Sequence, residues 1–305
     1  MAEAVEATDA KYPKALKEAL KNLTVSLGSK KLYYKGNWPA SPQGGDDDIF
    51  QNCLAVVGSR HLTYYGRKAT EQLVTEIATA GVTIVSGFMY GGDEAAHSAA
   101  VKCGLPGQGG KTIAVMPCGI DLIHPATQKK LYQEILDTGG LIISEYEGLT
   151  QPQTFTYIQR DRIVAGLSKA VLVTEAALES GSLITASYAK KFGKKIFALP
   201  GPINSEVSKG TNKLIKEGAT LVTEAKDILD FFKILPSAKN KKVEKSFVTG
   251  NTLEDKIIEQ LRREPLKVDE LARLFSVPVA KLGTSLSLMQ LKGFINNDNG
   301  KYYIN

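Results

Sequence analysis

Seven short apolar runs rich in β-branched residues recur between residues 53 and 222, and stretches long enough for helices separate them. Strands that are apolar at nearly every position are typical of a parallel sheet covered by helices on both faces. The sequence therefore predicts an α/β fold built on a parallel sheet. Ligands of such sheets bind in the loops at the carboxyl ends of the strands, so functional residues are expected there. The runs are 54–57, 82–86, 112–116, 141–144, 170–174, 195–199 and 220–222.

Two breaks in composition divide the chain. The first, at 36–48, combines Pro, Gly, Ser and a run of carboxylates, and it predicts a loop. The second, at 235–250, is rich in lysine and lacks apolar periodicity. Beyond it, three helical patterns and two short strands around an Asn-Asp-Asn-Gly turn have the layout of a winged helix. The predicted parts are an N-terminal extension and loop (1–50), a main domain (51–234), a Lys-rich linker (235–250) and a small C-terminal winged helix-like domain (251–305).

The charge of the chain gives only a weak indication of a polyanionic partner. The net charge is 38 − 32 = +6. Residues 233–250 supply 5 − 1 = +4 of it, whereas 251–305 supply 8 − 7 = +1. A lysine run of this kind is usually a solvated linker, so a polyanion would have to be held by locally clustered side chains.

Composition also excludes several classes of protein. No apolar run approaches the ~20 residues of a membrane-spanning helix, and residues 1–10 do not resemble a secretory signal. Three cysteines (Cys53, Cys103 and Cys118) cannot form a disulfide framework, and no Cys or His pair has the spacing of a metal site. We expect a cytoplasmic protein with no cofactor, no metal and no membrane partner.

The loops after the first two strands are rich in glycine. In the first, Gly58 permits close approach of a ligand, Ser59 offers a donor, and Arg60 is either a phosphate ligand or an exposed loop arginine. The dinucleotide fingerprint G-x-G-x-x-G is absent. The second loop contains Gly87 and Gly91, and Asp93 after them is expected to be a helix N-cap.

The segment QTFTYIQRDRIVAGLS (153–168) places aromatic and guanidinium groups close together. Arginine matches phosphate oxygens and aromatic rings stack on bases, so Tyr157, Arg160 and Arg162 could bind a single strand. The alternative is that Phe155 belongs to the core and Asp161 neutralises the arginines. The residues alone do not favour either interpretation.

Two later loops could bind anions at helix starts. Gly181, Ser182 and Thr185 lie in ALESGSLITAS, and Gly210 and Asn212 lie in SKGTNKLI. A plain capping motif is the alternative for each. No serine lies in G-x-S-x-G and no Cys–His pair is indicated, so nucleophilic catalysis has no candidate.

Ten strings occur in a family-specific order along the chain: VGSR, SG…GGDEAAH, TIAVMPCGID, HP, LIISEY, RDRIVAGLS, VLVTEA, SGSLITA, FALPGP and KGTNKLI. In this order they resemble the DNA-processing protein A family (DprA, also called Smf) over roughly 53–232. LARLFSVPVAKLGTSLSLMQLKGFI resembles the family's optional C-terminal winged helix.

The resemblance implies an extended Rossmann-like domain that binds single-stranded DNA without catalysing a reaction on it. It also implies a homodimer that protects incoming strands and loads the recombinase RecA during natural transformation. Tyr157 occupies the position of a base-stacking phenylalanine, and Arg160 with Arg162 matches an Arg-x-Arg pair. The other matching positions are Gly58, Ser59, Arg60, Gly87, Gly91, Gly181, Ser182 and Thr185.

The chain departs from the family pattern at a few positions. Asp161 stands between the two arginines where the family usually has asparagine, so it could pair with an arginine and compete with phosphate, or order the arginines. The second loop has Met89 and Gly92 where a small residue and an aliphatic residue are typical.

Two other functions compete with strand binding. A nucleotide sensor or phosphoribohydrolase on a related fold would use P-G-G-x-G-T with a nearby glutamate. Here the loop reads ESGSLIT without paired glycines, although Glu175 and Glu179 are close to it. A transcription factor is supported only by the winged helix.

Overall fold

A computed structural model describes residues 3–21, 23, 31–39, 48–103, 110–235, 252–298 and 300–304. The chain forms two compact units, one ending at Asn240 and one beginning at Lys241. Nearly all of the predicted linker at 235–250 lies outside the described residues. In the part of the chain that the structure describes, no helix has both the length and the apolar character needed to cross a membrane.

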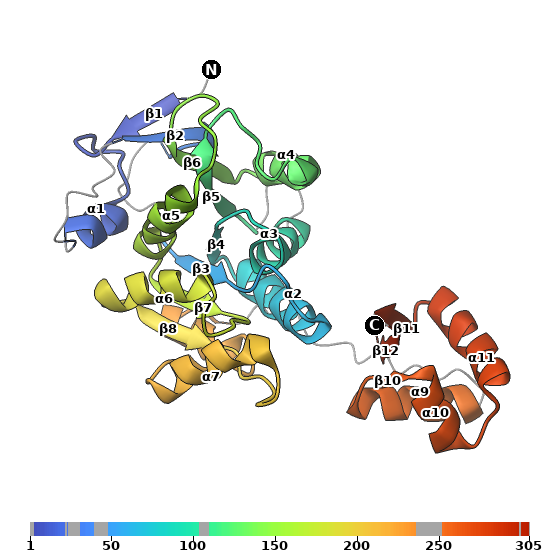
Figure 1. Cartoon of the computed structure of the whole chain (residues 1–305). Helices are drawn as coiled ribbons and strands as arrows, with labels where there is room; N and C mark the ends of the chain where they lie inside the picture. The colour runs from blue at the N-terminus through green and yellow to red at the C-terminus, as the bar shows by residue number, and fades with distance from the viewer. Residues whose placement is uncertain are drawn as a thin grey trace. The chain divides into compact units, whose positions relative to one another are not determined.

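The larger unit is built on a nine-stranded sheet (Figure 1). Its strand order is β1-β2-β6-β5-β4-β3-β7-β8-β9. The strands are β1 (Glu3–Glu6), β2 (Lys31–Gly36), β3 (Cys53–Val57), β4 (Thr83–Ser86), β5 (Thr112–Gly119), β6 (Leu141–Tyr146), β7 (Ala170–Val173), β8 (Lys195–Ala198) and β9 (Thr220–Leu221).

Strands β3 to β9 are parallel and correspond to the seven predicted runs, which confirms the predicted α/β class. From β3 the chain builds outward through β4, β5 and β6, and then returns to place β7 on the other side of β3. This reversal between β3 and β7 is a topological switch point, where α/β sheets bind ligands.

The N-terminal segment contributes two strands that the sequence did not predict. Strand β2 pairs antiparallel with β6, with Tyr33 opposite Ser144, and β1 pairs antiparallel with β2. Behind this edge, the ring of Trp38 lies 4.6 Å from that of Tyr34 and 5.0 Å from that of Phe50. The indole N–H of Trp38 donates to the Lys11 carbonyl at 3.1 Å. These contacts fix the N-terminal segment to the sheet.

Helices cover both faces of the sheet (Figure 1). Helices α1, α5 and α6 pack on one face, and α2, α3, α4 and α8 pack on the other. Their bounds, with that of α7 beside β8, are α1 (Lys14–Lys21), α2 (Tyr64–Thr79), α3 (Gly92–Cys103), α4 (Lys129–Asp137), α5 (Thr154–Leu167), α6 (Ser182–Lys191), α7 (Lys209–Lys216) and α8 (Lys226–Phe232).

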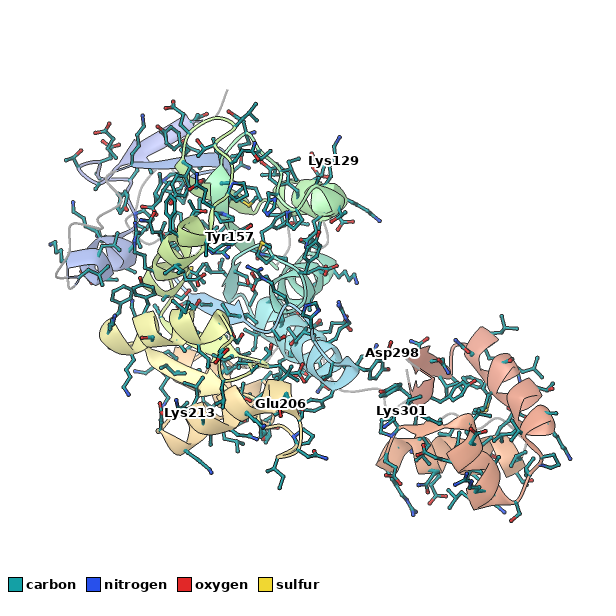
Figure 2. The ribbon with its side chains drawn as sticks, viewed as in Figure 1. Lys129, Tyr157, Glu206, Lys213, Asp298 and Lys301 are labelled. Atoms are coloured by element: carbon teal, nitrogen blue, oxygen red, sulfur yellow. The ribbon has the colours of Figure 1, made fainter. Side chains whose placement is uncertain are left out.

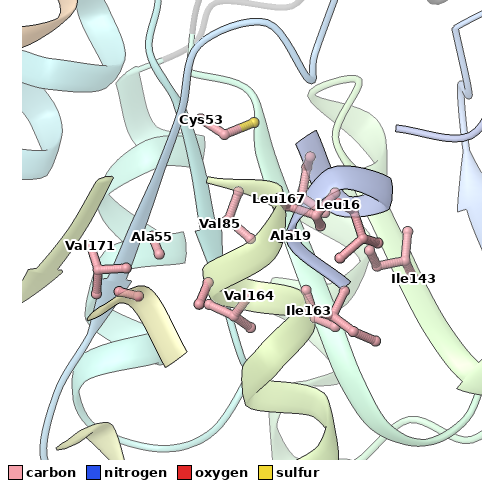
Figure 3. Close-up of a cluster of buried hydrophobic side chains, with 14 of the residues drawn as sticks. Leu16, Ala19, Cys53, Ala55, Val85, Ile143, Ile163, Val164, Leu167 and Val171 are labelled. Atoms are coloured by element: carbon pink, nitrogen blue, oxygen red, sulfur yellow. The ribbon is translucent and has the colours of Figure 1, made fainter. Parts of the chain in front are cut away.

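Helix α5 lies against the centre of the sheet because its inner face is apolar. Ile163, Val164 and Leu167 are buried there, in one cluster with Ala55 and Val85 of the central strands (Figure 3). Alternate residues of β3 belong to this cluster and to the cluster on the opposite face, and all five of its residues are buried. A strand enclosed on both sides needs no polar face. Helix α5 is therefore packed firmly against the central strands of the sheet.

The smaller unit has its own core and matches the predicted winged helix. Helices α9 (Thr252–Arg263), α10 (Val268–Phe275) and α11 (Val279–Leu291) enclose nine buried apolar residues together with a three-stranded sheet. The sheet consists of β10 (Leu266–Lys267), β11 (Ile295–Asp298) and β12 (Lys301–Ile304) in the order β10-β12-β11. Strands β11 and β12 form the predicted hairpin. The C-terminal unit therefore has an apolar core of its own.

Candidate functional site

A pocket of about 650 Å³ opens at the carboxyl ends of β3, β4 and β7, against the first turns of α5. It lies at the switch point between β3 and β7, where the connectivity predicts a binding site. Figure 2 shows Tyr157 of α5 in this region. Nine of the thirteen predicted site residues line the pocket: Gly58, Ser59, Arg60, Gly87, Tyr157, Arg160, Gly181, Ser182 and Thr185.

The loop after β3 is held in place by the loop after β7. The backbone N–H of Ser59 donates to the Glu175 carbonyl at 2.7 Å. The Glu175 carboxylate, which is buried, accepts from the backbone N–H of Thr63 at 2.8 Å and from its hydroxyl at 2.6 Å. Thr63 in turn caps α2 by accepting from the Gly66 N–H at 3.1 Å. Arg60 is therefore displayed on a fixed loop, and Glu175 is engaged in holding it.

Arg60 and Tyr157 form the exposed face of the site. The Arg60 guanidinium lies 5.2 Å from the centre of the Tyr157 ring, a cation–π distance. The Tyr157 hydroxyl lies 2.8 Å from Nε2 of His124, which fixes the ring. Burial, followed by the nearby Arg60, lowers the pKa of His124 below its ordinary value. A neutral imidazole can hold the tyrosine while Arg60 supplies the positive charge.

The glycines of the second loop make room for other parts of the site. A side chain at Gly87 would overlap the Arg160 guanidinium. Gly91, with φ +73°, and Gly92 pack against the first loop, and the Gly92 N–H donates to the Ser59 carbonyl at 3.0 Å. Gly91 thus lies outside the pocket lining and brings the two loops together.

Asp93 does not act as the predicted N-cap. It is the second residue of α3, and its carboxylate reaches back to accept the Met89 N–H at 3.1 Å. His97, one turn later, is buried with Nδ1 2.8 Å from the Thr112 hydroxyl. Burial and then Arg160 lower the pKa of His97 to about 3. The imidazole is neutral at physiological pH and packs within the core.

The two arginines of the Arg-x-Arg pair have different surroundings. Arg160 lies beneath the pocket, only 5% exposed, and donates to the carbonyls of Gly87 and Val115 and, through Nε, to Asp161 at 3.1 Å. Arg162 is also buried, but it lies outside the pocket lining and donates to the Glu145 carboxylate at 2.6 Å. The structure therefore brings Arg160, but not Arg162, to the site.

A pair of carboxylates lies beside Arg160. Asp161 lines the pocket with its side chain 14% exposed, and Asp93 is buried on the neighbouring helix. Burial raises the pKa of Asp161 to about 6 against the opposing effect of Arg160, and Asp93 raises it further. Burial also raises the pKa of Asp93. The buried Arg160 guanidinium thus lowers the pKa of both carboxyl groups, Asp93 and Asp161, against the effect of burial.

Helix α6 opens its first turn toward the pocket. Ser182 and Thr185 are buried at its start, and Gly181 adopts a helical conformation with no side-chain cap on the helix. The Ser180 and Ser182 hydroxyls lie 2.8 Å apart. The N–H groups of Ser182, Leu183 and Ile184 already donate to oxygens of Ser180 and Gly181. This end of α6 therefore offers an anion its hydroxyls and the positive end of the helix dipole.

Two predicted residues lie elsewhere. The Gly210 N–H donates to the Ala176 carbonyl at 2.8 Å, and the Asn212 side chain bonds both the N–H and the carbonyl of Gly201 at 3.3 and 3.0 Å. Neither lines the pocket. Both join α7 to the loops after β7 and β8, so their contribution is to position those loops.

Sequence reasoning missed some parts of the site and misjudged another. Phe155 is 51% exposed, so the alternative that it belongs to the core is wrong. Tyr90 and Ile158 line the pocket without having been predicted, and His124 supports Tyr157 from behind. The His-Pro string was the one available signal for His124, and the fold rather than the spacing brings it to Tyr157.

Comparison with known families covers both units. The family described as DNA recombination-mediator protein A matches residues 3–233, and the DprA winged helix domain matches residues 248–301. Protein Smf of Escherichia coli (strain K12) is 38% identical over 258 residues, covering 82% of this chain and 67% of that protein. DNA processing protein DprA of Streptococcus pneumoniae (strain ATCC BAA-255 / R6) is 41% identical over 201 residues, 66% of each chain. The chain spans about two thirds of the length of these relatives.

Solved structures give the same result. The X-ray structure of DprA from Streptococcus pneumoniae matches with a TM-score of 0.65 and 38% identity, over 75% of this chain and 74% of that one. DprA from Helicobacter pylori, whose structure is described as showing a single-stranded DNA binding mode, matches with a TM-score of 0.62 and 32% identity, over 76% and 96%. These matches confirm the resemblance seen in the ordered motifs, and the chain belongs to the DNA recombination-mediator protein A (DprA) family.

Proposed function

We propose that this protein binds single-stranded DNA in the pocket at the carboxyl ends of β3, β4 and β7. The observation that carries the proposal is the pairing of Arg60 with Tyr157 over a pocket that α6 enters with its N-terminus. A guanidinium and the positive end of a helix dipole suit phosphates, and an aromatic ring suits an unpaired base. The Helicobacter pylori relative is described as a single-stranded DNA binder, which supports the same substrate class.

In this proposal the strand contacts polar and aromatic side chains that line the pocket. Arg60, Tyr157 and Ser182 are the principal ones. Arg160 shapes the floor, whereas Gly91, Arg162, Gly210 and Asn212 act through the loops and helices that they hold. This division assigns the predicted residues to contacting and supporting roles.

In the cell, the proposed role is to protect incoming strands and to load RecA onto them during natural transformation, in the cytoplasm and as a homodimer. The description of the matched family as a recombination mediator supports the delivery of strands to a recombinase. The division into an extension, a main domain, a Lys-rich linker and a winged helix is part of the same proposal.

The protein acts on the strand by binding, without catalysing a reaction. A phosphoribohydrolase would need a glutamate free to act in the pocket, but the Glu175 carboxylate is occupied by Thr63. Glu179 lines the pocket and is exposed, but its loop, ESGSLIT, lacks the paired glycines of P-G-G-x-G-T. Hydrolysis therefore has no support from the arrangement of these groups.

The test is a titration of single-stranded and double-stranded oligonucleotides of equal length at several salt concentrations. We expect tighter binding of the single strand with little dependence on its sequence, because stacking and phosphate contacts are available to any unpaired strand. A nucleotide hydrolysis assay on the same preparation should show no turnover. Equal or tighter binding of the duplex, or turnover abolished by Glu179→Gln, would contradict the proposal.

A further inference from the structure

Two acidic residues of the pocket, Asp93 and Asp161, are not explained by the attraction of phosphates. Asp161 and Asp93 both line the pocket, and both interact electrostatically with the buried Arg160 guanidinium. Arg160 already donates to two backbone carbonyls as well as to Asp161. One arginine can neutralise one carboxylate, so when both acids are ionised this buried cluster carries an excess negative charge.

An incoming phosphate increases that excess. The charged groups facing Asp161 are Arg160 on its own helix, Asp93 on α3, and Arg60 on the loop after β3. Arg60 is the exposed cation among them, and a phosphate bound to it would use its charge. Asp161 would then be left with Arg160 shared between two carboxylates and with an additional anion nearby. A proton on Asp161 relieves this repulsion.

We propose that Asp161 couples strand binding to proton uptake, so that the strand binds the form of the site in which the Asp161 carboxyl is neutral. The inference rests on the proposed function, since it concerns how the same pocket accepts phosphate. It assigns to Asp161 the role of setting the affinity according to pH, which an asparagine at this position cannot do.

The direction of the effect follows from linkage. Burial raises the pKa of Asp161 to about 6, so we expect its carboxyl group to be neutral below that pH and ionised above it in the free protein. A bound phosphate raises the pKa of Asp161 further, so binding takes up a proton above that pH. Affinity should be constant at low pH and then fall by at most about tenfold per pH unit as the pH rises, which is the limit for a single linked proton.

The experiment measures the affinity of the full chain for a labelled oligothymidylate from about pH 5 to about pH 8 at constant ionic strength. Wild type is compared with Asp161→Asn, whose amide oxygen can still accept from Arg160. We expect similar affinities at the lowest pH, a decline with pH for wild type only, and tighter binding by Asp161→Asn at the highest pH. Calorimetry in two buffers of different ionisation enthalpy should show proton uptake for wild type and none for the variant.

The matched control is His124→Gln, because His124 is a second titratable group close to the binding face, bonded to the Tyr157 hydroxyl. This variant should keep the wild-type decline with pH. A pH dependence that disappears in His124→Gln and persists in Asp161→Asn would overturn the inference and assign the proton to the histidine. Weaker binding by Asp161→Asn at every pH would also overturn it, by showing that the carboxylate orders Arg160.

Other outcomes separate this inference from the proposed function. Binding of the strand by wild type above about pH 6 without proton uptake overturns the inference alone, whether or not Asp161→Asn folds. Failure of wild type to bind single strands at any pH overturns the proposed function, and the inference with it.

Discussion

The guanidinium of Arg160 occupies the space that a side chain on Gly87 would fill, and it donates a hydrogen bond to the Gly87 carbonyl. The end of β4 and the middle of α5 therefore meet through one glycine and one buried arginine. The floor of the pocket depends on this contact.

Replacing Gly87 with alanine should force Arg160 to move. We expect the free energy of unfolding to fall by roughly 1–3 kcal/mol, as for other overpacked sites, and strand binding to weaken. Chemical denaturation and an anisotropy titration measure the two effects. Gly181→Ala is the matched control, since it also lines the pocket but an added methyl there meets nothing within 4 Å. Equal stability of the two variants would refute the contact.

Substitution by alanine should affect DNA binding at Arg60 and the stability of the fold at Arg162. Loss of the exposed Arg60 should make the slope of log affinity against log salt shallower by roughly 0.7, the value for one phosphate contact on a single strand. Loss of the buried Arg162 leaves the partly buried Glu145 without its partner, so stability should drop by roughly 3–5 kcal/mol. Its salt slope should stay at the wild-type value. A shallower salt slope in a folded Arg162→Ala protein would show that Arg162 contacts a phosphate of the DNA strand.

Tyr157→Ala should lose roughly 1–3 kcal/mol of strand affinity if the ring stacks on a base. Tyr157→Phe retains the ring and removes only the hydroxyl that bonds His124, so it should lose much less. Tyr65→Ala is the control, because its hydroxyl donates to the Pro200 carbonyl and the residue does not line the pocket. Unchanged affinity of Tyr157→Ala for the DNA strand would show that the ring does not stack on a base.

A chain truncated after Ile234 should keep most of its affinity for single strands. The winged-helix unit packs around its own apolar core, and residues 251–305 carry only 8 − 7 = +1. A second chain, ending at Gly250, separates the effect of the lysines at 239–245 from that of the winged helix. Loss of essentially all binding after the first truncation, with the remaining unit still folded, would place the main site elsewhere.

The parallel sheet could be predicted because its strands are buried on both faces. Every residue of β3 and of β7 is buried, so the sequence shows uninterrupted apolar runs. The antiparallel edge has no such signal: β2 is buried at one position and exposed at both ends. Its place is fixed by its pairing with β6 and by the aromatic contacts behind it, which only the folded chain reveals.

The loops that form the site could be predicted from the sequence. The role of each residue in them could not. Arg160 and Arg162 look equivalent in sequence, yet residues two apart on a helix point about 200° away from each other. One therefore reaches Gly87 beneath the pocket, and the other reaches Glu145 on β6. Gly87 and Gly91 likewise look alike, while only Gly87 lines the pocket. Such differences depend on which neighbour each side chain meets.

Trp38 is the single tryptophan of the chain, and it lies between Tyr34 and Phe50 at the antiparallel edge of the larger unit. Intrinsic tryptophan emission therefore reports on that edge alone, and the winged-helix unit contributes none of it. A denaturation curve followed by this emission tracks the docking of the N-terminal segment, whereas far-ultraviolet circular dichroism follows both units. The protein thus carries a built-in probe that can separate the unfolding of its two parts without a label.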